Sequence, residues 1–118
     1  MSANRMNRID EEVKRALADI IRNDVKDDRL SDMVSVTRVE ITPDLKFAKV
    51  SVSVYGEEKR RHASIDALNH GASYIRGRLA KTVKLRRVPE LSFHLDNSIE
   101  YGIKIAKILN EVNSKENE

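Results

Sequence analysis

The chain contains no cysteine and no tryptophan, and only five of its 118 residues are aromatic. Without cysteine it can form neither disulfides nor thiolate metal sites, a composition that is compatible with a reducing cytosol. A core with so few aromatic side chains must be built mainly from Ile, Leu, Val and Ala. This composition favours helices packed on a sheet, which is an α+β fold.

Long apolar runs are also missing. Residues 1–10 have no apolar core of the signal-peptide type, and no stretch approaches the length needed to cross a bilayer. We therefore expect a cytoplasmic protein with no membrane partner. The length fits one domain spanning residues 1–118, which we expect to be ordered over about 4–112 and to end in a polar tail at 113–118.

The first half of the sequence predicts a helix followed by a hairpin. Apolar residues recur every three or four positions over about residues 4–25, which is typical of an amphipathic helix. They alternate in a first strand over 33–42, where the phase slips by one position between Val36 and Val39 and so predicts a β-bulge or a twist. A proline-containing turn then leads into a returning strand over 45–55.

The second half predicts a broken helix, a strand and a last helix. One apolar stripe at helical spacing crosses residues 58–85. Because a glycine inside a helix costs about 1 kcal/mol relative to alanine, we expect two helices joined by a kink at Gly71, Ala72 and Ser73. A strand over 91–95 and a helix over about 98–112 follow.

The predicted element order is therefore α-β-β-α-(kink)-α-β-α around a three-stranded mixed sheet. The second and third strands are joined by a helical crossover, so we expect them to be parallel neighbours.

Positive charge is concentrated in one part of the chain. Residues 59–89 hold nine Lys or Arg against a single acid, Asp66, whereas the whole chain carries only +3. Such segregation costs self-repulsion in the folded state and indicates an anionic partner, for which nucleic acid is the leading candidate.

Helical winding should gather these bases into one outward face. On a helix, Ile75 and Leu79 lie in a narrow apolar arc, and the bases occupy the remaining arc. Gly77 lies among them, where a missing side chain would let a phosphate come close. A charged face that is only solvated would mix signs, yet no acid occurs between residues 67 and 89, which favours nucleic-acid binding. The candidate RNA-binding residues are Arg76, Arg78, Lys81, Lys84, Arg86 and Arg87.

Other chemistry has little support in the sequence. His62 and His70 are two helical turns apart, too far to chelate one metal unaided, and His94 should point outward from its strand. There is no Gly-x-Ser-x-Gly turn and no glycine-rich phosphate loop. We therefore predict no active site, no cofactor, no metal and no small-molecule substrate.

The last predicted helix is apolar on more than one side. One line of the helix carries Ile99, Ile103 and Ala106, and another carries Tyr101, Ile105, Ile108 and Val112. Coverage by the rest of the fold is the default explanation. The alternative is an exposed strip on which another protein docks.

Three stretches of the sequence closely resemble bacterial ribosome-binding factor A. They are Ser35 to Val50, Tyr74-Ile75-Arg76, and Leu85 to Phe93 followed by Asp96-Asn97-Ser98, and the similarity runs from about Asn4 to Val112. The resemblance implies a type II K-homology fold and a monomeric, non-catalytic factor. It also implies binding to the small ribosomal subunit and its RNA, help in late maturation and processing of that RNA, and importance at low temperature.

The chain departs from K-homology domains in general at one motif. Those domains clamp nucleic acid with a Gly-x-x-Gly loop between two helices, and this chain has none. The resembled family reduces that loop to an Ala-x-Gly kink, and here the matching position reads Gly71-Ala72-Ser73. Two alternatives stay open at this point: a structural ribosomal protein with a basic face, and a protein-interaction module that docks through its last helix.

Overall fold

The computed structural model describes residues 3–30, 33–97, 103 and 105–112, and its elements follow the predicted order. Residues 105–112 are also helical, whereas 98–102 and 104, at the start of the predicted last helix, lie outside the described residues, as does the predicted tail at 113–118. The predicted α+β class is confirmed. The elements are α1 (Ala3–Asn23), β1 (Val34–Ile41), β2 (Phe47–Val54), α2 (Glu58–His70), α3 (Ala72–Thr82) and β3 (Glu90–Leu95).

The three strands form one mixed sheet in the order β1-β2-β3. β1 pairs with β2 antiparallel, and β2 pairs with β3 parallel, as the helical crossover predicts. The register of the antiparallel pair shifts between Val36 and Arg38. This shift lies where the apolar alternation slips in the sequence, so the predicted irregularity of the first strand is confirmed.

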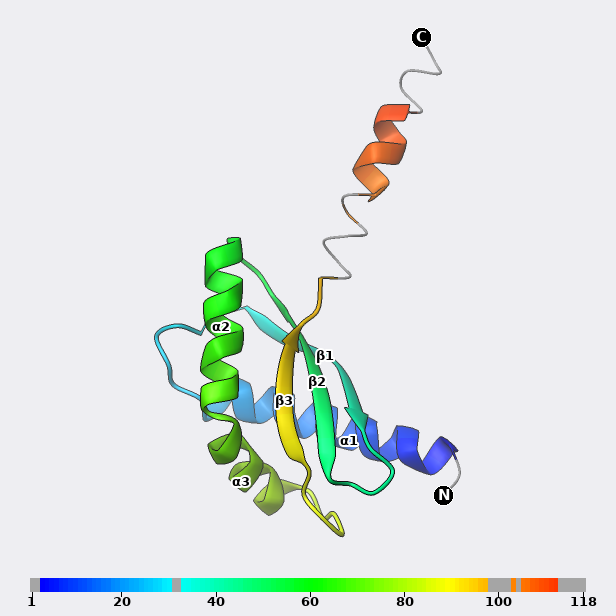
Figure 1. The fold of residues 1–118 in the computed structure, drawn as a ribbon, viewed down its shortest axis with the longest axis vertical. Coiled ribbons are helices and arrows are strands. Elements are labelled where there is room, and N and C mark those ends of the chain that lie inside the picture. Colours follow the sequence, from blue (N-terminus) through cyan, green and yellow to red (C-terminus); the bar gives the residue numbers. More distant parts are fainter. Residues whose placement is uncertain (1–2, 31–32, 98–102, 104, 113–118) are drawn as a thin grey trace.

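The helices α1, α2 and α3 pack on one face of this sheet. Along β2, Ala48, Val50 and Val52 are buried, whereas Lys49 between them is exposed. α1 packs on β1, while α2 and α3 pack on β3. Figure 1 shows α1 crossing behind β1 and β2, with α2 running beside β3. One aliphatic core therefore fills the space between the helices and the sheet, with Phe93 as its buried aromatic residue in the described part of the chain.

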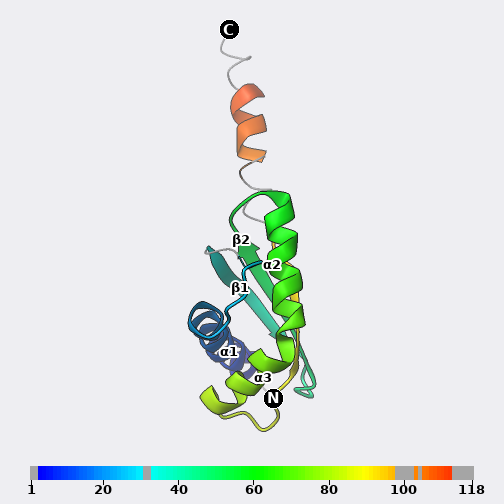
Figure 2. The same cartoon turned by 90° about the vertical axis from the view of Figure 1, so that its left-hand side faces the viewer.

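The long helical stretch is broken where the sequence predicts. α2 and α3 are separated by Gly71, and both views show α3 turning away from the axis of α2 (Figures 1 and 2). The helical backbone bonds of both helices meet at Gly71, since Gly71 N donates to the Ala67 carbonyl of α2 and Ile75 N of α3 donates to the Gly71 carbonyl, each at 3.0 Å. The break is one residue wide, and Ala72 and Ser73 already belong to the first turn of α3.

One predicted boundary is wrong. The apolar stripe indicated a helix to about residue 85, but α3 ends at Thr82 and Val83 is extended, with φ −118° and ψ 132°. Val83 still packs against the core from this extended position, as does Leu85. The stripe continued in the sequence because both residues are apolar and partly buried, not because both are helical.

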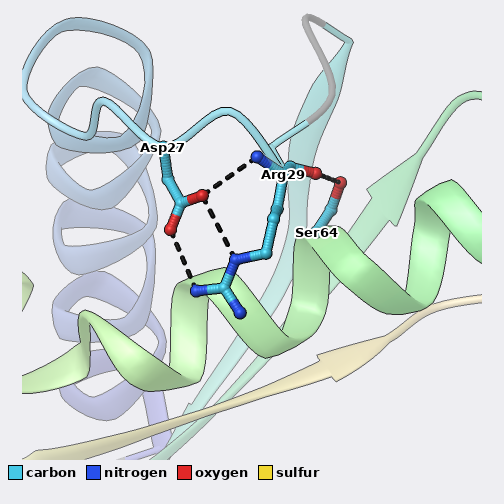
Figure 3. A network of polar contacts seen from close by, with 3 residues as sticks. All are labelled: Asp27, Arg29 and Ser64. Carbon is cyan, nitrogen blue, oxygen red and sulfur yellow. Dashed lines mark hydrogen bonds and ion pairs between the residues drawn. The ribbon is translucent and has the colours of Figure 1, made fainter.

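The loop between α1 and β1 is fixed to α2 by polar contacts, and Figure 3 draws those of Asp27, Arg29 and Ser64. The Asp27 carboxylate accepts hydrogen bonds from Nε of Arg29 at 3.2 Å and from its Nη2 at 3.0 Å, and these bonds lower the pKa of Asp27. The Arg29 carbonyl accepts from Oγ of Ser64, and Arg60 donates to the Leu30 carbonyl at 3.0 Å. The loop is thereby held against α2, and Arg60, one of the clustered bases, serves the fold.

The helical residues 105–112 present apolar side chains to solvent. Ile105, Ile108 and Val112 are 37%, 46% and 46% exposed. The default expectation that the rest of the fold covers this side is therefore wrong. None of the described helices is both long enough and apolar enough to span a bilayer.

Candidate nucleic-acid interface

The six predicted RNA-binding residues are all exposed and lie on two consecutive segments, α3 and the α3–β3 loop of residues 83–89. We call them the basic ridge: Arg76, Arg78 and Lys81 on α3, with Lys84, Arg86 and Arg87 in the loop. Lys84 was expected on the helix, but it follows the helix end because α3 stops at Thr82.

The apolar side of α3 decides which way the ridge faces. Ile75 and Leu79 are completely buried in the core, so the bases on the opposite side of the helix face solvent. Gly77 lies on this outer side, and a Cβ atom built there would meet nothing within 4 Å. The surface beside Gly77 is therefore open for a ligand to come close to the helix backbone.

Arg76 connects the two segments of the ridge. Its Nε and Nη2 donate to the Val88 carbonyl at 3.2 and 2.9 Å. A guanidinium group has five N–H donors, so these bonds leave others for a phosphate. Arg76 thus also fixes the position of the loop that carries Arg86 and Arg87.

Arg78 is the ridge residue with a carboxylate partner. Its Nε lies 3.3 Å from Oδ2 of Asp24, which belongs to the loop held against α2. An exposed pair of this kind contributes little to stability, but it offsets one positive charge. Within the described part of the chain, four of the six bases face solvent without an ion pair or a side-chain hydrogen bond: Lys81, Lys84, Arg86 and Arg87.

The sequence prediction missed one base, Arg8. The α3–β3 loop, the β1–β2 turn and α1 together line a cleft of about 800 Å³, and Arg8 of α1 lines it together with Lys84, Arg86 and Arg87. Both views place these three segments at the same end of the sheet (Figures 1 and 2). Charges of both signs are mixed along α1, so no pattern in its sequence separates Arg8 from its neighbours.

The histidines have other partners. His62 lies 3.7 Å from a carboxylate oxygen of Glu58, one helical turn away, and Nε2 of His94 lies 3.0 Å from Oγ of Ser92. Over the residues that the structure describes, no three His, Asp or Glu side chains gather to hold a metal ion.

The fold and the ridge define a class: an α+β, K-homology-like domain with a cationic face. The particular family follows from comparison with known proteins. The family model described as Ribosome-binding factor A matches residues 5–109. The chain belongs to this family.

Individual relatives agree along nearly their whole length. Ribosome-binding factor A of Clostridium kluyveri is 49% identical over 118 residues, covering 100% of this chain and 96% of the relative. That of Acetivibrio thermocellus is 47% identical over 111 residues, covering 94% and 90%.

Solved structures are similar as well. The crystal structure of ribosome-binding factor A from Thermus thermophilus has a TM-score of 0.68 and 29% identity, covering 76% of this chain and 94% of that one. Coordinates of the Thermus thermophilus factor fitted into the cryo-EM map of a 30S complex have a TM-score of 0.62 and 28% identity, covering 75% and 91%. These solved structures belong to the same family and share the predicted α+β fold class.

Proposed function

We propose that this protein is a non-catalytic assembly factor that binds the small ribosomal subunit through its RNA. It acts in the cytoplasm as a monomer and assists the late maturation and processing of that RNA. Family membership supports the class of function, and the Thermus thermophilus relative fitted into a 30S complex supports the partner.

The observation that carries the proposal is the set of four ridge bases that face solvent without an ion pair or a side-chain hydrogen bond. Phosphates are the anions that a folded RNA presents at regular spacing, and Lys and Arg side chains position a protein on them without reading sequence. Few aromatic side chains are available as stacking platforms, so backbone and shape recognition should dominate.

The mechanism is a shift between RNA conformations. A rigid ridge that binds one arrangement of phosphates better than another favours that arrangement by its difference in affinity. The fold supplies the rigidity, because Ile75 and Leu79 are fully buried and Arg76 ties the loop to α3. No bond is made or broken by the protein in this mechanism.

A charge-reversal triple variant tests the proposal. Lys81, Arg86 and Arg87 are changed together to Glu, and binding to purified small subunits is measured against the wild type. A control triple variant changes Lys26, Lys49 and Lys59 to Glu, which alters the net charge equally at exposed positions off the ridge.

We expect the ridge variant to bind at least about a hundredfold more weakly and the control to lose much less. Equal losses would mean that net charge alone governs binding, and the ridge would have no special role.

Sedimentation separates an assembly factor from a structural ribosomal protein, which would also carry a basic face. An assembly factor travels with immature small subunits and is depleted from translating ribosomes. A protein found in constant amount on translating ribosomes would contradict the proposal.

A further inference from the structure

The cleft beside the α3–β3 loop has features that a general phosphate-binding surface does not need. It measures about 800 Å³, within the range of sites that hold small ligands, and it is built from three segments far apart in the sequence. We define two parts of it by their residues. The basic rim is Arg8, Lys84, Arg86 and Arg87, and the aliphatic floor is Ile9, Leu45 and Leu85.

The rim favours an anion. Its four bases come from two segments, Arg8 from α1 and the others from the α3–β3 loop, against the two acids Glu12 and Asp44 in the same lining. A phosphate entering the cleft would meet positive charge from both segments, and such a cleft concentrates the field of its charges.

The floor favours a flat apolar group. Leu45 is buried to 8% exposure, and Ile9 and Leu85 are partly buried against the core. Aliphatic side chains held in this way can pack against the face of a nucleobase, although they do not bind it as strongly as an aromatic side chain would. RNA is recognised mainly through unpaired bases that are turned out of the helical stack.

The β1–β2 turn is built to hold the floor in place. Leu45 has φ 61°, a left-handed conformation that non-glycine residues rarely adopt. Three bonds enforce it: Leu45 N donates to the Thr42 carbonyl at 2.8 Å, Thr42 Oγ1 donates to Oδ1 of Asp44 at 2.6 Å, and Lys46 N donates to the same Oδ1 at 3.0 Å. Backbone conformations this costly persist where the surrounding structure fixes them, often at binding sites.

Asp44 adds a means of selection. The Thr42 hydroxyl and the Lys46 N–H lower the pKa of Asp44, so its carboxylate is ionised at neutral pH and can only accept hydrogen bonds. Adenine, cytosine and guanine carry an exocyclic amino group that can donate to it, whereas uracil does not.

We infer that this cleft receives one unpaired nucleotide of the bound RNA, with its phosphate against the basic rim and its base on the aliphatic floor. The inference rests on the proposed function, because it assumes an RNA partner, and it adds a base-binding site to a surface otherwise made for phosphates.

The test uses the full-length protein with methyl-labelled Ile, Leu and Val, titrated with the 5′-phosphorylated trinucleotide pApApA and followed by NMR. A trinucleotide of the same charge in which every base is missing serves as the ligand control. We expect the methyl signals of Leu45 and Leu85 to shift with pApApA but not with the abasic ligand, while those of Val52 in the distant core stay in place. The uridine analogue should bind several-fold more weakly than pApApA.

Two matched variants locate the binding. Arg8→Gln should weaken pApApA binding about tenfold, because it removes one rim charge at an exposed position. Lys59→Gln removes the same charge from α2, outside the cleft, and should leave this affinity unchanged. Circular dichroism shows whether each variant is folded.

The outcomes separate this inference from the proposed function. If the wild type binds small subunits but pApApA shifts no floor methyl group, the nucleotide site is wrong and the proposed function stands. Equal binding of the abasic ligand would reduce the cleft to a phosphate site and overturn the inference. If Arg8→Gln weakens binding to small subunits while pApApA does not compete with small subunits for the cleft, the occupant is a protein and the inference fails. Failure of the wild type to bind small subunits would overturn the proposed function itself.

Discussion

Arg76 and Val88 hold the two halves of the basic ridge together, because the Arg76 guanidinium donates twice to the Val88 carbonyl, at 3.2 and 2.9 Å. Val88 precedes Pro89, a buried residue that has no N–H and lies directly before β3. The contact therefore fixes the α3–β3 loop at a point where the backbone itself offers few hydrogen bonds.

We expect Arg76→Ala to speed hydrogen exchange of the amides at residues 84–88 and to lower the free energy of unfolding by about 1 kcal/mol, since hydrogen bonds of this kind contribute about that much. Mass-spectrometric exchange measures the first effect and urea unfolding the second. Lys81→Ala is the control: it removes a ridge charge without touching the loop, so exchange at 84–88 should not change. Unchanged exchange in Arg76→Ala would mean that Arg76 does not position the loop.

Asn69 protects the free edge of the sheet. Its side-chain Nδ2 donates to the Phe93 carbonyl at 3.0 Å, and its Oδ1 accepts from Phe93 N at 2.8 Å. β3 is an edge strand, so its outer N–H and C=O groups could pair with a strand of another chain. At Phe93 the side-chain amide of Asn69 occupies both of these groups.

We expect Asn69→Ala to lower the free energy of unfolding by about 1–3 kcal/mol, because it leaves two partly buried backbone groups unsatisfied. Asn69→Asp keeps an acceptor for Phe93 N but loses the donor to the Phe93 carbonyl, so it should destabilise the protein as well. Asn110→Ala, at an exposed helical position, is the control. Denaturant unfolding curves decide the matter, and equal midpoints for all three variants and the wild type would contradict this role.

The salt dependence of the binding affinity reports how many phosphates the protein contacts. Six contacts would give a slope of about 5 between the logarithms of affinity and salt concentration, while the five ridge bases that have no carboxylate partner would give between about 3.5 and 4.5. We expect the lower value, because Asp24 pairs with Arg78, whereas the neutral Val88 carbonyl leaves the charge of Arg76 available to a phosphate. Affinity for small subunits measured from low to moderate salt gives the slope. A value near zero would remove the electrostatic mechanism.

The pH dependence of the free energy of unfolding should show the destabilising effect of the ionised Asp10 side chain. Burial raises the pKa of this carboxyl group, and the charges of Glu40 and Glu11 raise it further, against the lowering effect of a hydrogen bond from the Ile41 backbone. The folded state therefore binds the Asp10 proton up to a higher pH than the unfolded state does. Ionised Asp10 thus destabilises the fold at neutral pH, and this cost disappears as pH falls through the folded-state pKa.

We expect Asp10→Asn to raise Tm at pH 7, and the gain over the wild type to shrink as pH falls, since protonated Asp10 and Asn are both neutral. Thermal unfolding between pH 7 and pH 4 measures the difference. Asp28→Asn, in the exposed part of the α1–β1 loop, is the comparison, and its Tm should follow that of the wild type closely. A gain that grows toward acid pH would have the wrong sign for this account.

Sequence patterns predicted the features that depend on local periodicity. The phase slip after Val36 predicted the irregularity in the register of β1, and Gly71 predicted the helix break. The contacts of Arg76 with Val88 and of Arg78 with Asp24 were not predictable, because they join residues that only the folded chain brings together. The same holds for the cleft, whose walls come from three segments and whose base Arg8 lies in a helix of mixed charge.

The exposed apolar side of residues 105–112 provides the last test, because it supports a rival in which the protein docks on another protein. Ile105→Asp and Ile108→Asp, made together, place two charges on this side without removing core contacts, since both residues lie outside the core cluster. If the basic ridge carries the affinity, the double variant should bind small subunits within about threefold of the wild type and keep the same salt slope. Loss of binding by this variant, together with wild-type affinity that salt barely affects, would replace the ridge with a hydrophobic docking strip. Arg86→Glu in the same assay is the positive control, because it should weaken binding while leaving residues 105–112 unchanged.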